Sequence, residues 1–167
     1  MKIHLKLIPF LLVFVLVLVS CRDYQAVNDS IIESLQKDVP FAIIIPSYFP
    51  EGIRPTVASV GLPTYNEFDN SIELGFTFIG KDENHFISIM EKSVEVTVIG
   101  NEPFQIYNIN DIKILEQNSG LLLRTGYLYS WNKDKSHFDV HVVGYDRTEG
   151  RKVVESMINS RSNVVSP

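Results

Sequence analysis

The feature of the sequence that most constrains the fold is a two-residue alternation of apolar and polar side chains. Residues 72–78 carry Ile, Leu, Phe and Phe at every second position, and residues 138–142 carry Phe, Val and Val in the same way. Successive side chains of a strand point to opposite faces, so this period is typical of strands with one buried face. Shorter apolar runs predict further strands at 42–45, 56–62, 85–90, 94–98, 121–124 and 127–131.

The strands at 127–131 and 138–142 predict a hairpin. Residues 132–135 read Asn-Lys-Asp-Lys and predict a four-residue loop. That loop sets the strand register, which pairs Trp131 with Ser136, Tyr129 with Phe138 and Tyr127 with Val140. This register places the large apolar side chains on one face, so we expect the two tyrosines and the tryptophan to be buried rather than to stack on a carbohydrate or a peptide.

The apolar period changes to that of a helix near the C-terminus. Asp146 and Glu149 have the spacing of a helix-capping pair. The apolar face that follows comprises Val153, Val154, Met157 and Ile158. The predicted fold class is therefore α+β, an antiparallel sheet of about six to eight strands with a C-terminal helix packed on one face. We expect the helix to close a packed core; a lid over an open lipid cavity is the alternative.

The first twenty residues stand apart from this domain. Lys2 and Lys6 form a short basic start, and residues 7–19 form an uncharged apolar block. This block is 13 residues long, which is the length of a signal-peptide core. It is shorter than the roughly 20 residues that cross a bilayer as a helix. Residues 1–20 therefore predict a secretory signal peptide.

The apolar block ends in Leu18-Val19-Ser20-Cys21, and Cys21 is the one cysteine of the chain. This ending resembles a bacterial lipobox. The resemblance implies that the signal peptide is cleaved between Ser20 and Cys21, that the Cys21 thiol receives a diacylglycerol and that the freed amino group is acylated with a fatty acid such as palmitate. We expect the protein to be lipid-anchored on the extracytoplasmic face of the cell membrane, or on the outer membrane if the host has two.

The predicted organisation has four parts: the signal peptide at 1–20, a lipidated N-terminus and tether at 21–39, a globular α+β domain at 40–158, and a flexible tail at 159–167. Within the tether, Ser30 and Glu33 have capping-box spacing, which predicts a short helix ending before Pro40. Its apolar face comprises Ile31, Ile32, Leu35 and Val39. We expect this helix to pack on the domain; contact with the membrane is the alternative.

The charge of the chain bears on its partners. The formal net charge is −5, and without residues 1–20 the chain has 13 basic and 20 acidic residues, a net charge of −7. An acidic domain repels phosphate groups, so neither nucleic acid nor an anionic membrane surface is expected as a direct partner. The expected partners are the membrane, through the anchor at Cys21, and a protein of the cell envelope.

A second resemblance covers most of the folded part. Residues 46–52 read Pro-Ser-Tyr-Phe-Pro-Glu-Gly, which resembles the Pro-x-Tyr-Leu-Pro-Glu-Gly opening of the bacterial domain of unknown function family 4367. Phe49 stands where that family usually has leucine. Weaker similarity continues through residues 96–100, Trp131, the strand at 138–143 and residues 154–157. The resemblance implies an accessory domain of envelope proteins, without an enzymatic activity.

The chemistry-bearing residues do not form a recognisable catalytic motif. His137, Asp139 and His141 alternate along a strand, which separates the two histidines by about 13 Å at ~3.3 Å per residue, too far to share a metal ion. We expect these three side chains to lie on the solvent face of the sheet; a pH-sensitive patch is the alternative. No catalytic residue, metal or cofactor is expected, and the protein is not expected to be an enzyme.

Three functions remain for comparison with the structure. The first is a non-catalytic interaction or envelope-sensing module of unknown ligand. The second is a carrier that holds a lipid or acyl chain inside a curved sheet, related to lipoprotein-sorting proteins. The third is an envelope hydrolase, which would need a buried pair of histidine and carboxylate beside a nucleophile.

Overall fold

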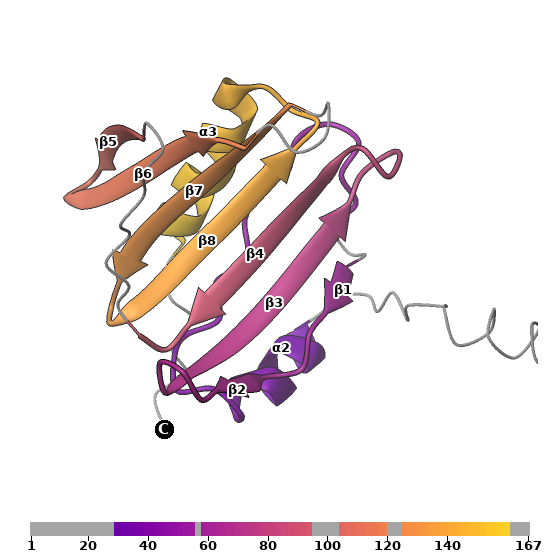
Figure 1. The fold of residues 1–167 in the computed structure, drawn as a ribbon. Helices are drawn as coiled ribbons and strands as arrows, with labels where there is room; N and C mark the ends of the chain where they lie inside the picture. The colour runs from indigo at the N-terminus through magenta and orange to yellow at the C-terminus, as the bar shows by residue number, and fades with distance from the viewer. Residues whose placement is uncertain (1–28, 56–57, 95–103, 120–124, 161–167) are drawn as a thin grey trace, which may run out of the picture.

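The computed structural model describes residues 29–55, 58–94, 104–119 and 125–160. Within these ranges the chain forms two helices and a sheet of eight strands. In chain order the elements are α2 (Asp29–Gln36), β1 (Ala58–Val60), β2 (Thr64–Asn66), β3 (Ser71–Ile79), β4 (Phe86–Lys92), β5 (Gln105–Ile109), β6 (Ile112–Asn118), β7 (Gly126–Lys133), β8 (Ser136–Val143) and α3 (Arg147–Asn159) (Figure 1).

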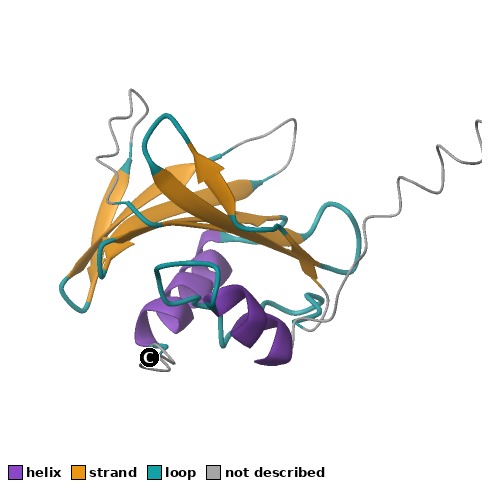
Figure 2. Ribbon diagram, turned by 90° about the horizontal axis from the view of Figure 1, so that it is seen from below, coloured by secondary structure: helices purple, strands orange, loops and turns teal. Residues whose placement is uncertain are grey.

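The sheet is antiparallel throughout. Its strand order is β1-β3-β4-β8-β7-β6-β5, and β2 also pairs with β3 beside β1. The sheet is curved, and both helices lie on its concave side (Figure 2). This architecture confirms the predicted α+β fold class and the C-terminal helix packed on one face.

The core lies between the concave face and the helices. Strand alternation and register align inward side chains in rows, one of which runs Leu74, Glu91, Phe138 and Trp131 across four strands. The rings of Trp131 and Phe138 are stacked with centroids 5.1 Å apart. The burial expected for Tyr129 and Trp131 is confirmed, since they are 0% and 3% exposed. Tyr127, which is half-buried, packs against the same core.

Helix α3 begins and packs as its sequence predicts. Asp146 is the N-cap residue, and its side chain accepts a hydrogen bond from the Glu149 amide at 2.9 Å. The inward side chains are Val153, Val154, Met157 and Ile158, all buried. Gly150 permits the helix to approach β7, because a Cβ at this position would clash with the hydroxyl and ring of Tyr129. The helix ends at Asn159, one residue beyond the predicted domain boundary, and residues 161–167 of the expected flexible tail lie outside the described ranges.

The N-terminal part of the described chain covers the rest of the concave face. Helix α2 was expected, but it begins at Asp29, so Ser30 lies in its first turn and not at the cap. The helix packs on the domain, as expected: Leu35 is buried, and Ile31 and Ile32 pack against the core. Residues 37–50, which we call the strap, then run beneath the sheet; Phe49 packs edge-to-face on Phe78 of β3, with ring centroids 4.9 Å apart.

The prediction of a strand at 42–45 is wrong, because these residues form no strand and pair with none of the described strands. Two of their backbone amides donate to side chains instead. The Gln36 side chain donates to Phe41 O at 2.6 Å and accepts from Ile43 N at 3.0 Å. Ile44 N donates to Glu91 Oε1 at 2.9 Å. Apolar side chains of the run enter the core, which explains why its composition resembles that of a buried strand.

The register predicted for the β7–β8 hairpin is also wrong, by two residues. The observed pairs are Trp131 with Phe138, Tyr129 with Val140 and Tyr127 with Val142. The loop contains only Asp134 and Lys135, whose φ angles are +52° and +63°. Positive φ at both positions is the geometry of a two-residue type I′ turn. A shift of two residues keeps each side chain on its face, so the predicted burial survives the error.

The remaining sequence predictions vary in outcome. Within the strand predicted at 56–62, the structure has β1 at Ala58–Val60; residues 56 and 57 lie outside the described part of the chain. The predicted strands at 94–98 and 121–124 fall mostly or entirely outside the described residues. In the 46–52 motif, Gly52 has a φ angle of +90°, and Tyr48 donates a hydrogen bond to Glu149 of α3. Through Tyr48, the end of the strap is therefore bound to the C-terminal helix α3.

The packing of α3 generates a stability prediction. Ile158→Ala should lower the free energy of unfolding by ~2–4 kcal/mol, because it removes a buried side chain and leaves a cavity. Ile106→Ala is the matched control, since Ile106 lies on β5 and is 59% exposed; a surface change of this kind should cost less than about 1 kcal/mol. Urea unfolding measures both. Equal losses in the two variants would contradict a packed interface beneath α3.

Candidate functional site

The residue predicted to carry the lipid is Cys21, and the predicted cleavage site lies between Ser20 and Cys21. Both residues lie outside the described part of the chain, together with the rest of the predicted signal peptide and the predicted tether up to residue 28. Their role stays a prediction. Titratable side chains meet on both faces of the sheet, and outside it in the Asp82–His85 and Glu149–Lys152 pairs.

The convex face carries a polar network centred on Asp139 of β8. Ser130 of β7 donates a hydrogen bond to Asp139 Oδ1. His137 Nε2 lies 3.1 Å from the same oxygen, and His137 Nδ1 lies 2.7 Å from Asn132 Oδ1. Burial by itself would raise the pKa of the Asp139 carboxyl, but the hydrogen bonds from His137 and Ser130 outweigh it and hold that pKa below its usual range.

The network continues across β4 and β3. Lys92 is the register partner of both Glu73 and His137, and its ammonium group lies 2.8 Å from Glu73 Oε1. Asn66 of β2 donates to the same carboxylate at 2.9 Å. The Lys92 contact, followed by the Asn66 hydrogen bond, lowers the pKa of Glu73. We call the set Glu73, Lys92, Ser130, Asn132, His137 and Asp139 the polar band.

The structure corrects the expectation for one member of this band. Alternation does place His137, Asp139 and His141 on the face opposite the helices, as the sequence predicts. His137 is nevertheless only 2% exposed, so it is buried and not solvent-facing. Neighbouring polar side chains occupy its hydrogen-bonding atoms. Among the described residues, no group of three or more His, Cys, Asp or Glu is placed to hold a metal ion.

The order of groups in the polar band differs from that of a hydrolase triad. In a triad, the histidine stands between the serine and the carboxylate and removes the proton of the serine hydroxyl. Here Asp139 stands between Ser130 and His137, so the serine donates to a carboxylate. This geometry orients the serine and the histidine but does not activate Ser130 as a nucleophile.

A separate Ser-His contact lies near the end of the sheet. Ser119 Oγ lies 2.5 Å from His141 Nε2, and burial lowers the pKa of the His141 imidazole. A Cβ at Gly126 would lie 3.0 Å from Ser119 Oγ and 3.2 Å from His141 Nε2, so the glycine makes room for the pair. Sequence reasoning missed Ser119 and Gly126, because the contact joins residues 22 positions apart.

The concave face contains a buried carboxyl group that sequence reasoning also missed. Glu91 of β4 is 0% exposed, and Ile44 N donates to its Oε1. Its Oε2 is buried without a hydrogen-bond partner in the described part of the chain. Burial raises the pKa of this carboxyl to about 8, and the hydrogen bond from Ile44 offsets only part of that effect. The group is therefore mostly protonated at neutral pH and holds the strap without a buried charge.

A second buried carboxylate, Glu116 of β6, anchors helix α3. Arg147 Nε donates to its Oε1, and Arg151 Nε donates to its Oε2 at 2.7 Å. The Arg151 guanidinium also lies over the ring of Tyr107, 4.4 Å from its centroid. Two cations on one buried carboxylate fix the angle of the helix on the sheet. The sequence did contain a signal for the burial of both carboxyl groups, namely the alternation of the strands. Glu116 follows Ile112 and Ile114 on the inward face of β6, and Glu91 follows Ile87 and Ile89 on the inward face of β4.

Comparison with known proteins adds no relative: no family model, no curated protein and no solved structure matches the chain. The resemblances to the lipobox and to domain of unknown function family 4367 therefore stay predictions. None of the helices in the described ranges has the length and apolar composition needed to span a membrane.

The raised pKa of Glu91 predicts how stability depends on pH. Between pH 4.5 and about 8 the unfolded chain loses the Glu91 proton while the folded chain keeps it. The free energy of unfolding should therefore fall as pH rises through this window, at up to about 1.4 kcal/mol per pH unit from this group.

Glu91→Gln tests this dependence. The amide keeps an acceptor for Ile44 N and cannot titrate, so the variant should gain stability relative to the native protein as pH rises from 5 to 8. Contributions from Asp139, Glu73 and His141 are common to both proteins and cancel in the difference. Urea unfolding at several pH values provides the measurement, and parallel pH profiles would show that Glu91 is already ionised in the folded state.

Proposed function

We propose that this protein is a lipid-anchored lipoprotein of the extracytoplasmic face of the cell membrane, and that its folded domain is a non-catalytic module for interaction or envelope sensing. The observation that carries the proposal is the N-terminal segment, in which a basic start and a 13-residue apolar block lead to Leu18-Val19-Ser20-Cys21. Two or three acyl chains on one cysteine anchor a protein stably, whereas a single chain holds it marginally.

The arrangement of polar groups supports an interaction module. In the polar band, Asp139 receives contacts from Ser130 and His137, and Glu73 receives contacts from Lys92 and Asn66. These contacts hold the side chains in fixed positions on the face of the sheet opposite the helices. His137 and Ser130 are buried and act as supports, whereas Asn132 is exposed and Glu73, Lys92 and Asp139 are partly exposed. Donors and acceptors that are held in this way are suited to recognising a partner surface, because little side-chain entropy is lost on binding.

The packing of the concave face bears on the carrier alternative. A carrier needs space between sheet and helices for an acyl chain. Here α3 fills that position, and Val153, Val154 and Met157 are each 0% exposed. On the β3–β4 side the strap places Phe49 against Phe78. The chain itself occupies the surface that a lipid would use, which favours the interaction module.

Cys21→Ala tests the anchor. The variant should no longer incorporate labelled palmitate, because the only thiol of the chain is gone, and it should accumulate as a precursor or leave the membrane. Ser20→Ala is the control: alanine is also small, so labelling and membrane attachment should persist. Palmitate incorporation by Cys21→Ala would place the lipid elsewhere and remove the basis of the proposal.

Native mass spectrometry of the intact protein, extracted from membranes, separates the module from the carrier. For the module, the native mass should equal that of the processed chain with its covalent acyl groups. A carrier would show additional lipid that dissociates when the protein is denatured. Stoichiometric recovery of such lipid would decide in favour of the carrier.

A further inference from the structure

Three large apolar side chains are exposed along one edge of the sheet. Leu62 is 81% exposed, Tyr65 58% and Phe68 101%. In the sequence, all three lie between the last residue of β1 and the first residue of β3. We call them the edge patch. Single exposed apolar residues are normal on protein surfaces, but these three lie within seven positions of the sequence, in and on either side of the short strand β2.

Hydrogen bonds hold the edge patch in its exposed conformation. Asn66 Oδ1 accepts from the Phe68 amide at 3.0 Å, and Asp69 Oδ1 accepts from the Ser71 amide at 3.1 Å. The Tyr65 hydroxyl donates to Asn70 Oδ1 at 2.7 Å. The turn between β2 and β3 is thus fixed by its own polar side chains, and the Phe68 ring points into solvent as a consequence.

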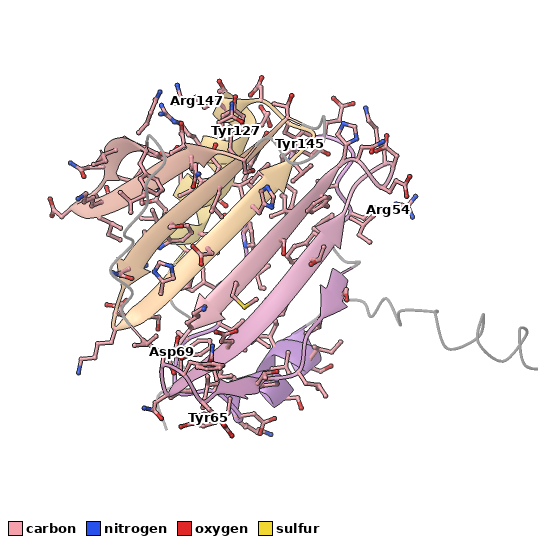
Figure 3. The ribbon with its side chains drawn as sticks, viewed as in Figure 1. Arg54, Tyr65, Asp69, Tyr127, Tyr145 and Arg147 are labelled. Carbon is pink, nitrogen blue, oxygen red and sulfur yellow. The ribbon has the colours of Figure 1, made fainter. Side chains whose placement is uncertain are left out.

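The edge patch lies on the same edge of the sheet as helix α2, the first described element of the chain. Helix α2, whose first residue is Asp29, lies along the β1–β2 edge of the sheet on the concave side (Figures 1 and 2). Tyr65 pairs with Ile72, whose side chain packs against the core, so Tyr65 also projects on this side. Tyr65 and Asp69 lie at the end of the molecule opposite Arg147 and Tyr145 (Figure 3).

The length of the tether limits how far this edge can be from the lipid. Eight residue steps separate Cys21 from Asp29 in the sequence, and a fully extended chain of that length spans at most about 29 Å. A domain of this size is about 35 Å across. An anchor at Cys21 would therefore keep the start of α2 within about 29 Å of the lipid, and β5 lies at the other edge of the sheet from β1.

We propose that the edge patch is a membrane-contact surface, in which Leu62, Tyr65 and Phe68 enter the headgroup region of the bilayer that carries the Cys21 anchor. The inference rests on the proposed lipidation of Cys21. Phenylalanine and leucine side chains gain by burial in the acyl boundary, and tyrosine is enriched at the membrane interface because its ring is apolar and its hydroxyl is polar. This contact fixes the orientation of the domain and turns the β5 edge away from the membrane.

The acidic side chains of the turn between β2 and β3 favour a membrane whose headgroups carry no net charge. Glu67 and Asp69 flank Phe68 in the sequence. Their carboxylates are repelled by a surface of anionic headgroups, whereas phosphatidylcholine carries no net charge. The contact should therefore be stronger on zwitterionic than on anionic membranes.

Tryptophan placed in the patch measures the contact. Full-length Phe68→Trp protein is extracted from cell membranes, its mass is determined, and it is reconstituted into phosphatidylcholine vesicles with or without brominated acyl chains. Its new tryptophan should emit at shorter wavelength and lose most of its fluorescence to the bromine atoms. Ile106→Trp is the matched control on β5 and should lose almost none. Trp131, which is 3% exposed, contributes the same background to both proteins.

The outcomes separate the two proposals. A mass without acyl groups on Cys21 would refute the lipidation itself. If the protein is acylated but the Phe68→Trp and Ile106→Trp variants are both unquenched, or are quenched equally, the membrane contact alone is overturned. Tyr65→Trp provides a second reporter if Phe68→Trp does not fold. If the Phe68→Trp fluorescence is quenched less when phosphatidylglycerol replaces phosphatidylcholine, the proposed contact is supported. If it is quenched more, the preference for a zwitterionic membrane is contradicted.

Discussion

The fold depends on covering one apolar face of a single curved sheet. Antiparallel strands pair with each other, but their inward side chains remain in water until another layer covers them. The cover comes from both ends of the described chain. Helix α3 covers one part, and it can approach closely because Gly150 has no side chain to meet Tyr129. Helix α2 and the strap cover the rest. The N-terminal segment is therefore part of the core, although its position next to the predicted anchor suggests a mere tether.

The sequence predicted the parts of the fold that depend on local periodicity. The alternation in β3 and β8 and the apolar face of α3 sufficed for the fold class. The errors arose where non-local contacts decide. The apolar run at 42–45 is not a strand because the side chains of Gln36 and Glu91 take the hydrogen bonds that a neighbouring strand would make. The β7–β8 register was missed because its two-residue turn contains Asp134 and Lys135, both with positive φ, instead of the glycine that usually marks such a turn.

The same distinction applies to the polar side chains. Alternation assigned His137 and Asp139 to the correct face, but the burial of His137 depends on neighbours from an adjacent strand. The two buried carboxyl groups were detectable in principle, because Glu91 and Glu116 continue the inward series of isoleucines in β4 and β6. What the sequence did not contain was how each is stabilised. Glu116 is paired with two arginines of α3, whereas burial raises the pKa of Glu91 so that it stays protonated.

The contact between the strap and Glu91 has a mechanical consequence for an anchored protein. If Cys21 carries the proposed lipid and the domain binds a partner, a pull between the two would enter the domain through α2 and reach the strap before any strand. The first bonds to bear that load are the side-chain contacts of Gln36 and the hydrogen bond from Ile44 to Glu91. Strands that shear along their length share a load over many bonds, but these few contacts break one after another. Detachment of this N-terminal layer, which would also break its apolar packing, would uncover the apolar concave face while the sheet stayed intact.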